Sequence, residues 1–319
     1  STTGVYTNPV DDSIWIKTGE TTSTLPSTYP NAVNSGIAGE SFVSNNLNAT
    51  PIDASGNVSL EIGSITQALP YSVNADIWVG ARTGTGAYIA SDVFKFTWNG
   101  TRYDFTGVHW AAGTGGGYRG IAHDGTNLWV STGVNNSDEI IQYSEAGVAT
   151  GNTINYSSDI PANHGSGAVS SIAYDGTHLY ILHTALTASA SAPAYIMKYL
   201  LNGTFVSAFA LPYSAGNVYT SVTFTGTGSL LLGLRQPSIL LIQINKTTGA
   251  TETPLFASIF PGRHSFLYIP NQTGNAIKFI SLNGQNEVIR HRWDTDNYIF
   301  GDTTARTSAM GDGQPLFIK

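Results

Sequence analysis

Aromatic, arginine and histidine side chains gather in the long, irregular segments between the apolar runs of this sequence. They are Arg82, Tyr88, His109, Trp110, Tyr118, Arg119, His164, His183 and Arg235. Aromatic rings offer flat faces for stacking, guanidinium and imidazole groups hydrogen-bond polar ligands, and such residues also anchor protein partners. These nine residues are therefore the candidate ligand-binding residues, for a glycan or for a protein surface.

The residues that could perform catalysis form no recognisable set. A glycosidase needs two facing carboxylates, and Asp76, Asp92, Asp138, Glu139 and Asp159 are available, but no spacing selects a pair. A serine hydrolase needs a Gly-x-Ser-x-Gly turn between a strand and a helix, and the sequence has no such motif. We therefore assign no catalytic residue and expect a non-enzymatic protein.

The sequence contains no recognisable motif for binding a transition metal or a phosphate group. The chain has no cysteine, and its seven histidines form no His-x-His or His-Glu-x-x-His cluster. The glycine-rich stretch 113–117 lacks the Lys-Ser/Thr of a phosphate-binding loop. We expect no cofactor, with one alternative: a structural Ca²⁺ ion held by the oxygens of Asp11, Asp12 or Asp53.

Net charge and composition argue against some classes of partner and favour certain locations. The net charge is −7 at pH 7, and the 14 Lys and Arg residues are scattered singly, which argues against a nucleic-acid partner. No apolar run approaches the roughly 18 residues of a membrane span. Charged residues make up only 11% of a chain rich in Ser, Thr, Asn and Gly, which favours a virion or an extracellular, cell-surface location.

The apolar residues that must position these side chains follow a repeat. A phrase of an aliphatic, then an aromatic or aliphatic, then an aliphatic residue occurs four times, with its first members 51 residues apart. The copies are Ile77-Trp78-Val79, Leu128-Trp129-Val130, Leu179-Tyr180-Ile181 and Leu230-Leu231-Leu232. A fixed period of this length is typical of a repeat architecture.

A second apolar phrase follows each copy and leads into a glycine turn. These turns are Asn99-Gly100, Ala146-Gly147, Asn202-Gly203 and Thr248-Gly249. In two repeats Asp124-Gly125 and Asp175-Gly176 also precede the first phrase. Gly after Asn or Asp supplies the positive φ of a tight hairpin turn, so we interpret these Asp residues as structural.

Each repeat provides about four short strands in roughly 40 to 50 residues, the size of a β-propeller blade. The sequence predicts one all-β domain over residues 1–319: a β-propeller of six four-stranded blades, with five or seven blades as alternatives. The predicted blades span about 4–62, 70–107, 118–156, 169–212, 219–257 and 258–293. Residues 294–319 would form a closing strand or begin a further module, and the aromatic residue of each phrase would lie between blades.

Connections in such a blade alternate between two faces. The connections with glycine turns are short, whereas those on the other face are long, among them residues 20–50, 81–91, 108–119, 157–169 and 183–194. Binding residues concentrate on loops that a rigid scaffold holds, so we assign the nine candidates to this long-loop face. A structural alternative remains for each: Trp110 could fill space between loops, and Arg82 and Arg235, at equivalent repeat positions, could form repeated ion pairs.

Several of these features also carry a family resemblance. Ile14-Trp15-Ile16-Lys17-Thr18-Gly19, the Ser/Thr-rich stretch 23–30 and the Asp-Gly-Thr-x-Leu-Trp/Tyr repeats resemble β-propeller regions of tail-fibre and tail-spike proteins of tailed phages and prophages. The resemblance spans most of the chain, and no family binding residue can be carried over position by position. It implies a virion appendage that recognises a host surface, often as a trimer.

Three functions follow as hypotheses. The first is a non-enzymatic receptor-binding or adhesion propeller that recognises a host-surface glycan or protein through its long-loop face. The second is an extracellular carbohydrate-active enzyme with carboxylates in the central channel. The third is a structural subunit of a larger appendage, in which residues 20–50 and the C-terminal strand would be assembly contacts.

Overall fold

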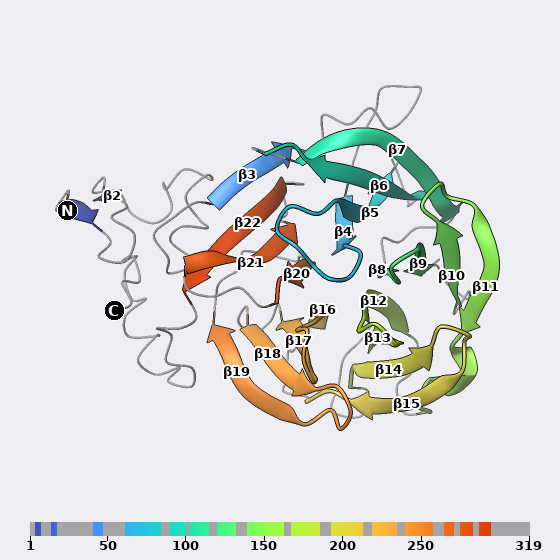
Figure 1. Ribbon diagram of the computed structural model, residues 1–319. Helices are drawn as coiled ribbons and strands as arrows, with labels where there is room; N and C mark the ends of the chain where they lie inside the picture. Colours follow the sequence, from blue (N-terminus) through green and yellow to red (C-terminus); the bar gives the residue numbers. More distant parts are fainter. Residues whose placement is uncertain are drawn as a thin grey trace.

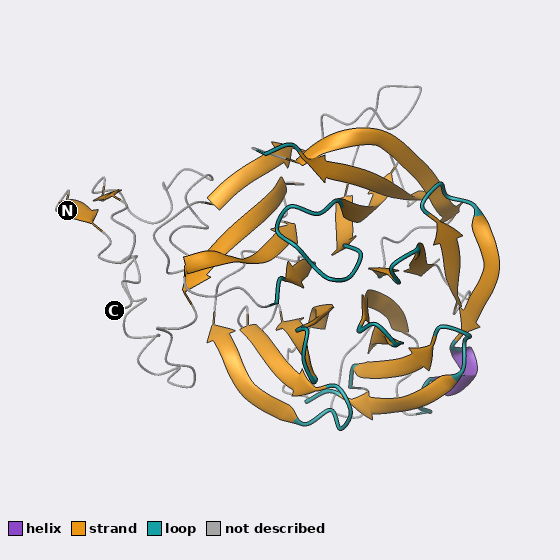
Figure 2. Ribbon diagram, in the orientation of Figure 1, coloured by secondary structure: helices purple, strands orange, loops and turns teal. Residues whose placement is uncertain are grey.

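The structure is a computed structural model in which most of the described residues form β-strands (Figures 1 and 2). It describes residues 4–7, 14–17, 41–46, 61–83, 90–100, 103–114, 120–131, 139–162, 167–185, 193–212, 219–234, 240–257, 265–270, 275–282 and 287–294. In these ranges the helical content is one short 3-10 turn, η3 (Ser157–Asp159), and no described helix could cross a membrane. The all-β prediction is confirmed.

The described strands form five four-stranded antiparallel sheets, which we call blades A to E. Blade A contains β4 (Glu61–Thr66), β5 (Ile77–Thr83), β6 (Ala90–Trp98) and β7 (Tyr103–Thr114). Blade B contains β8 (Ile121–His123), β9 (Asn127–Ser131), β10 (Glu139–Ser144) and β11 (Ala149–Asn155). Blade C contains β12 (Gly167–Tyr174), β13 (His178–Ala185), β14 (Tyr195–Leu200) and β15 (Phe205–Ala210).

The last two blades complete the ring. Blade D contains β16 (Tyr219–Phe224), β17 (Ser229–Leu234), β18 (Leu240–Asn245) and β19 (Thr251–Ala257). Blade E contains β20 (Phe266–Tyr268), β21 (Asn275–Leu282), β22 (Glu287–Asp294) and β3 (Ser41–Asn46), a strand from the other end of the chain. The innermost strands β4, β8, β12, β16 and β20 contact one another in turn, and β20 returns to β4, so the blades surround a common axis (Figure 1).

The described strands form five blades, which differs from the six of the leading prediction and agrees with its five-blade alternative. Residues 4–62 do not form a blade: β1 (Gly4–Thr7) and β2 (Ile14–Lys17) make a separate two-stranded sheet. The strand Ser41–Asn46, which lies in a segment predicted to be a long loop, pairs with β22 and supplies the fourth strand of blade E. The ring is therefore closed by an N-terminal strand, and the proposed closing segment after Asp294 lies outside the described residues.

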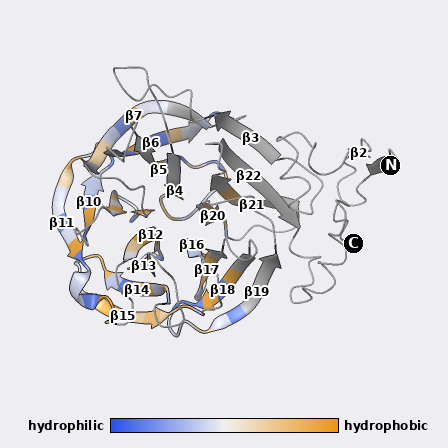
Figure 3. Cartoon of the chain, turned by 180° about the vertical axis from the view of Figure 1, so that it is seen from behind, coloured by the Kyte–Doolittle hydropathy of each residue, from blue (hydrophilic) through white to orange (hydrophobic). Residues whose placement is uncertain are grey.

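The three-residue apolar phrase that recurs every 51 residues lies in the second strand of blades A to D. Its side chains point alternately to the two sides of the strand, and this explains how the blades pack. Ile77 and Val79 pack with Leu267 and other residues of blade E, whereas Trp78 between them packs with residues of blade B. Successive side chains of a strand point to opposite sides, so one phrase joins its blade to both neighbours. Figure 3 shows hydrophobic residues in the described strands around the ring. The prediction that the aromatic residue lies between blades is confirmed.

Hydroxyl groups connect the innermost strands across four of the blade boundaries. The backbone N–H groups of Ile65, His123, Val222 and Tyr268 donate to the hydroxyls of Ser265, Thr66, Ser171 and Thr223, respectively, over 3.1 to 3.4 Å. At the remaining boundary Gly120 lies against Ile172, where any Cβ would be 2.3 Å from the Ile172 side chain. Buried N–H groups need partners, so these serine and threonine residues position neighbouring blades.

The Asp-Gly turns are structural, as predicted. Gly125 and Gly176 have φ values of 102° and 94°, a conformation that glycine adopts without strain. Asp124 accepts hydrogen bonds from the backbone N–H groups of Thr126 and Asn127 and, at 2.8 Å, from the Trp129 indole. The aspartate therefore fixes both the turn and the aromatic residue of the phrase.

Candidate functional site

Most of the predicted ligand-binding residues lie outside the described part of the chain. These are Tyr88, Tyr118, Arg119, His164 and Arg235, and they stay predictions. Arg82 lies on β5, where its backbone is opposite Glu61 and Ser91 in the sheet. The Ca²⁺ candidates Asp11, Asp12 and Asp53 also lie outside, and among the described residues no group of His, Asp and Glu could hold a metal ion.

His109 and Trp110 belong to strand β7 and not to a long loop, because β7 continues to Thr114. His109 is exposed and stacks on Phe94, with ring centroids 5.7 Å apart. Trp110 points to the opposite side of the strand, where its ring centroid is 4.8 Å from that of Tyr143 in blade B. Its indole N–H donates to the Glu145 carbonyl at 3.3 Å. Trp110 thus fills the boundary between blades A and B.

His183 is not available to a ligand. It lies on β13 with 1% of its surface exposed, and its ring is 5.5 Å from that of Tyr156, which follows the last strand of blade B. A residue this deeply buried between blades B and C has a packing role. His183 belongs to blade C, whereas His109 and Trp110 belong to blade A, and the burial of His183 counts against a single ligand site that includes all three.

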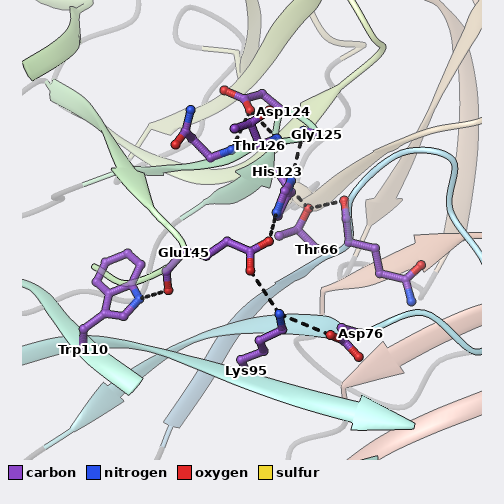
Figure 4. A network of polar contacts seen from close by, with 11 residues as sticks. Thr66, Asp76, Lys95, Trp110, His123, Asp124, Gly125, Thr126 and Glu145 are labelled. Atoms are coloured by element: carbon purple, nitrogen blue, oxygen red, sulfur yellow. Dashed lines mark hydrogen bonds and ion pairs between the residues drawn. The ribbon is translucent and has the colours of Figure 1, made fainter. Parts of the chain in front are cut away.

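The structure brings together a different set of polar residues, which sequence reasoning did not select as a group. We call it the acidic seam: Asp76, Lys95, His123 and Glu145, at the boundary between blades A and B (Figure 4). Asp76 immediately precedes β5, Lys95 lies on β6 opposite Trp78, His123 ends β8, and Glu145 begins the turn after β10. Three turns or strand ends and one central strand therefore supply the four side chains.

Lys95 is the centre of the acidic seam. Its ammonium Nζ is 3.2 Å from Asp76 Oδ2 and 3.0 Å from Glu145 Oε2, and it lies 5.0 Å from the centre of the Trp78 ring. Asp76 Oδ1 also accepts a hydrogen bond of 2.6 Å from the Thr97 hydroxyl. The lysine therefore joins one carboxylate of its own blade to one of the next, with an aromatic face beneath it.

His123 is held in one tautomer. The backbone N–H of Gly125 donates to its Nδ1 at 3.0 Å, so Nδ1 carries a lone pair. The ring proton of the neutral imidazole is then on Nε2, which donates to Glu145 Oε1 at 3.0 Å. Because the His123 side chain is 1% exposed, this bond fixes Glu145 from the interior while Lys95 contacts its second oxygen.

The electrostatics of the acidic seam favour charged groups. Burial acts to raise the pKa of Glu145, but the hydrogen bonds from His123 and Lys95 outweigh it, and the pKa is lowered. Burial acts in the opposite direction on Lys95, and its two carboxylate partners leave its pKa raised. Glu145 is therefore an ionised hydrogen-bond acceptor at neutral pH and has no proton to give as a general acid.

The carboxylates of the acidic seam remain accessible. The side chains of Asp76 and Glu145 are 42% and 44% exposed, and Lys95 is 21% exposed. Trp110 beside them is half-buried. Fixed carboxylates accept hydrogen bonds from hydroxyl groups, and a partly exposed indole offers an apolar face. This arrangement suits a polyhydroxylated ligand.

One signal in the sequence pointed toward this cluster, since Asp76 was among the candidate carboxylates. The others could not be found there, because Lys95 and Glu145 meet across a blade boundary at a separation of 50 residues. That separation is close to the repeat length. The two residues are not at equivalent repeat positions, however, because Lys95 corresponds to Gln142 and Glu145 to Trp98, so the repeat alone would not locate the pair.

Comparisons with known proteins give distant similarities only. No protein-family model and no curated protein sequence matches this chain. A solved protein of unknown function from Bacteroides caccae has 13% identity and a TM-score of 0.40, covering 73% of this chain and 82% of that chain. A neuraminidase-like protein of A/flat-faced bat/Peru/033/2010 has 14% identity and a TM-score of 0.41, covering 64% and 56%.

The Aleuria aurantia lectin, solved with alpha-methyl-L-fucoside, has 11% identity and a TM-score of 0.39, covering 64% of each chain. This chain thus spans less than two thirds of the length of the lectin and of the neuraminidase-like protein. Similarities at these levels carry no functional argument. The propeller assignment rests on the sheet topology, and the function must be argued from the residues of the chain itself.

Proposed function

We propose that this chain is a non-enzymatic receptor-binding propeller of a virion or cell-surface appendage, which recognises a host-surface glycan. One observation carries the proposal: the acidic seam holds two half-exposed carboxylates and a lysine in fixed positions beside Trp110. Sugars present hydroxyl donors and apolar ring faces, and both find complementary groups there. The ring of blades supplies the rigid support that such recognition needs.

The protonation states favour binding over hydrolysis. Cleavage of a glycosidic bond needs a carboxylic acid that is protonated at the working pH, which requires a raised pKa. Glu145 has a lowered pKa, because His123 and Lys95 stabilise its ionised form. The acidic seam therefore supports hydroxyl recognition.

Glycan-array and whole-cell binding of the intact chain test the proposal. We expect binding to a hydroxyl-rich, neutral glycan, and a loss of about tenfold or more in affinity on Glu145→Gln or Asp76→Asn. Glu252→Gln is the matched control: Glu252 is a similarly bonded carboxylate in blade D, where it accepts from Ser229 and Gln243. Equal binding by the wild type and both seam variants would refute the acidic seam as the site.

The same preparations distinguish binding from catalysis. Incubation with the bound polysaccharide should release no oligosaccharide. Release that disappears in Asp76→Asn would replace the receptor-binding function with the carbohydrate-active enzyme.

An assembly function is favoured by one separate feature. The hairpin of β1 and β2 forms its own sheet, outside the five blades (Figure 1). Two-stranded hairpins are rarely stable in isolation, so this one is suited to a contact within a larger appendage, such as a trimer. Light scattering of the intact chain and of a chain lacking residues 1–17 tests this, and a monomer in both cases would count against it.

A further inference from the structure

A second charged cluster lies at the boundary between blades C and D, where its charge balance is the opposite of that in the acidic seam. Its acidic member, Asp175, is 2% exposed. Asp175 Oδ1 accepts from the N–H groups of Thr177 and His178, at 2.9 and 2.7 Å. Asp175 Oδ2 accepts from the Tyr180 hydroxyl at 3.0 Å and from the Lys246 ammonium at 2.7 Å. Each carboxylate oxygen therefore has two donors already.

A second lysine stands beside this saturated carboxylate. Lys198 lies opposite Tyr180 in the sheet, and its ammonium is 5.5 Å from the centre of the Tyr180 ring. Within the part of the chain that the structure describes, no acid forms an ion pair with Lys198. Asp175 neutralises Lys246, and Lys198 is left as an excess positive charge over an aromatic ring.

Both ammonium groups lie over aromatic rings and remain partly exposed to solvent. Lys246 is 25% exposed, with its Nζ 4.9 Å from the centre of the Phe224 ring, and Lys198 is half-buried. His178, 21% exposed, lies within the field of both lysines. Burial first, and then the charge of Lys198, lower the pKa of His178, whereas Asp175 acts to raise it. Lys198 and Lys246 thus both act electrostatically on the His178 imidazole.

We propose that Lys198, Lys246 and His178 form a binding site for an oxyanion, a carboxylate or sulfate group carried by an acidic saccharide. The excess charge supplies the attraction, and the aromatic rings of Tyr180 and Phe224 limit the freedom of the two lysines, so little ordering is needed on binding. The ligand class follows from charge: a neutral sugar would leave Lys198 unpaired. This site is separate from the acidic seam and goes beyond the proposed function.

Isothermal titration with a sulfated oligosaccharide, a uronic-acid oligosaccharide, their neutral counterpart and inorganic sulfate, at matched ionic strength, tests the site. We expect saturable binding of at least one acidic saccharide that depends on Lys198, whereas any binding of the neutral one should not depend on Lys198. Lys198→Gln should weaken that binding about tenfold or more, because a charge-assisted hydrogen bond is lost. Lys278→Gln removes the same charge from blade E and should leave the affinity within about twofold.

A second measurement on the wild type does not depend on any variant's folding. An anion beside Lys198 should raise the pKa of His178, followed by NMR of labelled histidine with and without the saccharide. Unchanged His178 titration on saturation, or equal affinities for the Lys198 and Lys278 variants, would overturn the site. Inorganic sulfate binding as tightly as the saccharides would overturn the saccharide assignment. Loss of neutral-glycan binding in Glu145→Gln has no bearing on these outcomes, so the two proposals fail separately.

Discussion

Glu145 and Lys246 occupy the same position in two different blades and carry opposite charges. In the third strand of each blade, one residue pairs with the first member of the apolar phrase: Tyr143 pairs with Leu128, and Ile244 pairs with Leu230. Glu145 and Lys246 each lie two residues after that residue. Each reaches back to the preceding blade, Glu145 to Lys95 and Lys246 to Asp175. One structural position thus makes an ionic contact of either sign.

The two other residues at this position are apolar. Trp98 of blade A packs against the cluster that includes Leu267 of blade E, and Leu201 of blade C packs against the cluster that includes Ile154 of blade B. At this one position, four blade boundaries therefore carry an acidic, a basic, an aromatic and an aliphatic side chain. A blade placed beside the wrong neighbour would bury an unpaired charge, so these residues oppose incorrect blade order.

The contact between Lys95 and Glu145 should show measurable coupling. In a double-mutant cycle with Lys95→Met and Glu145→Gln, we expect a coupling energy of about 0.5–1 kcal/mol in urea unfolding at low salt, falling in 1 M salt. The value is modest because Glu145 is 44% exposed and solvent screens the pair. Additive single-variant effects at low salt would show that the two groups do not interact.

Two glycines offer a matched test of blade packing. Gly147 has φ +81°, and a Cβ there would be 2.3 Å from the Trp110 ring, whereas Gly100 has φ +98° with open space around it. Gly100→Ala should cost only the strain of a positive φ, about 1–2 kcal/mol. Gly147→Ala should cost a further 1–3 kcal/mol or so from overpacking. Equal losses of stability in thermal or urea unfolding would contradict the close packing of Trp110 on the turn.

The elements predicted from local sequence are those whose causes are local. The apolar phrases, such as Leu179-Tyr180-Ile181, are buried strands, and the Asp-Gly and Asn-Gly pairs are turns with positive φ. Blade number could not be obtained in this way. It depends on the pairing of β3 with β22, two strands that are far apart in the sequence, and no local periodicity records such a contact.

The candidate site, too, depends on contacts between residues far apart in the sequence, and these could not be predicted. His109 and Trp110 were placed in a loop because register shifts interrupt the ladder between β6 and β7 and obscure the two-residue alternation of a strand. The acidic seam depends on Lys95 meeting Glu145 across a boundary, and the sequence marks neither residue as special. Residue type can indicate what chemistry is available, but the fold decides which groups meet.

The Asp175 carboxylate should make stability depend on acid pH. Burial acts to raise its pKa, but Lys246, the turn N–H groups and Tyr180 lower it overall. A lowered folded-state pKa gives stability that is fully present above the ordinary value of about 4 and is lost as pH falls through the folded-state pKa. Asp175→Asn should lose about 3 kcal/mol at pH 7, and its difference from the wild type should shrink below about pH 4. Urea unfolding from pH 7 to pH 3 measures both, and a constant difference across that range would contradict the linkage.

Closure of the ring by β3 gives the sharpest prediction about the fold. Val43 lies opposite Ile289 in the ladder between β3 and β22. A proline at this position removes a backbone donor and restricts φ, so Val43→Pro should destabilise the chain by about 2–3 kcal/mol if β3 closes blade E. Val43→Thr keeps the backbone donor and the branched Cβ and is the matched control. Hydrogen exchange should speed up in residues 287–294 of the proline variant, and then in β4 and β20, whose contact completes the ring. Unchanged exchange in β22 would show that the blade is complete without β3.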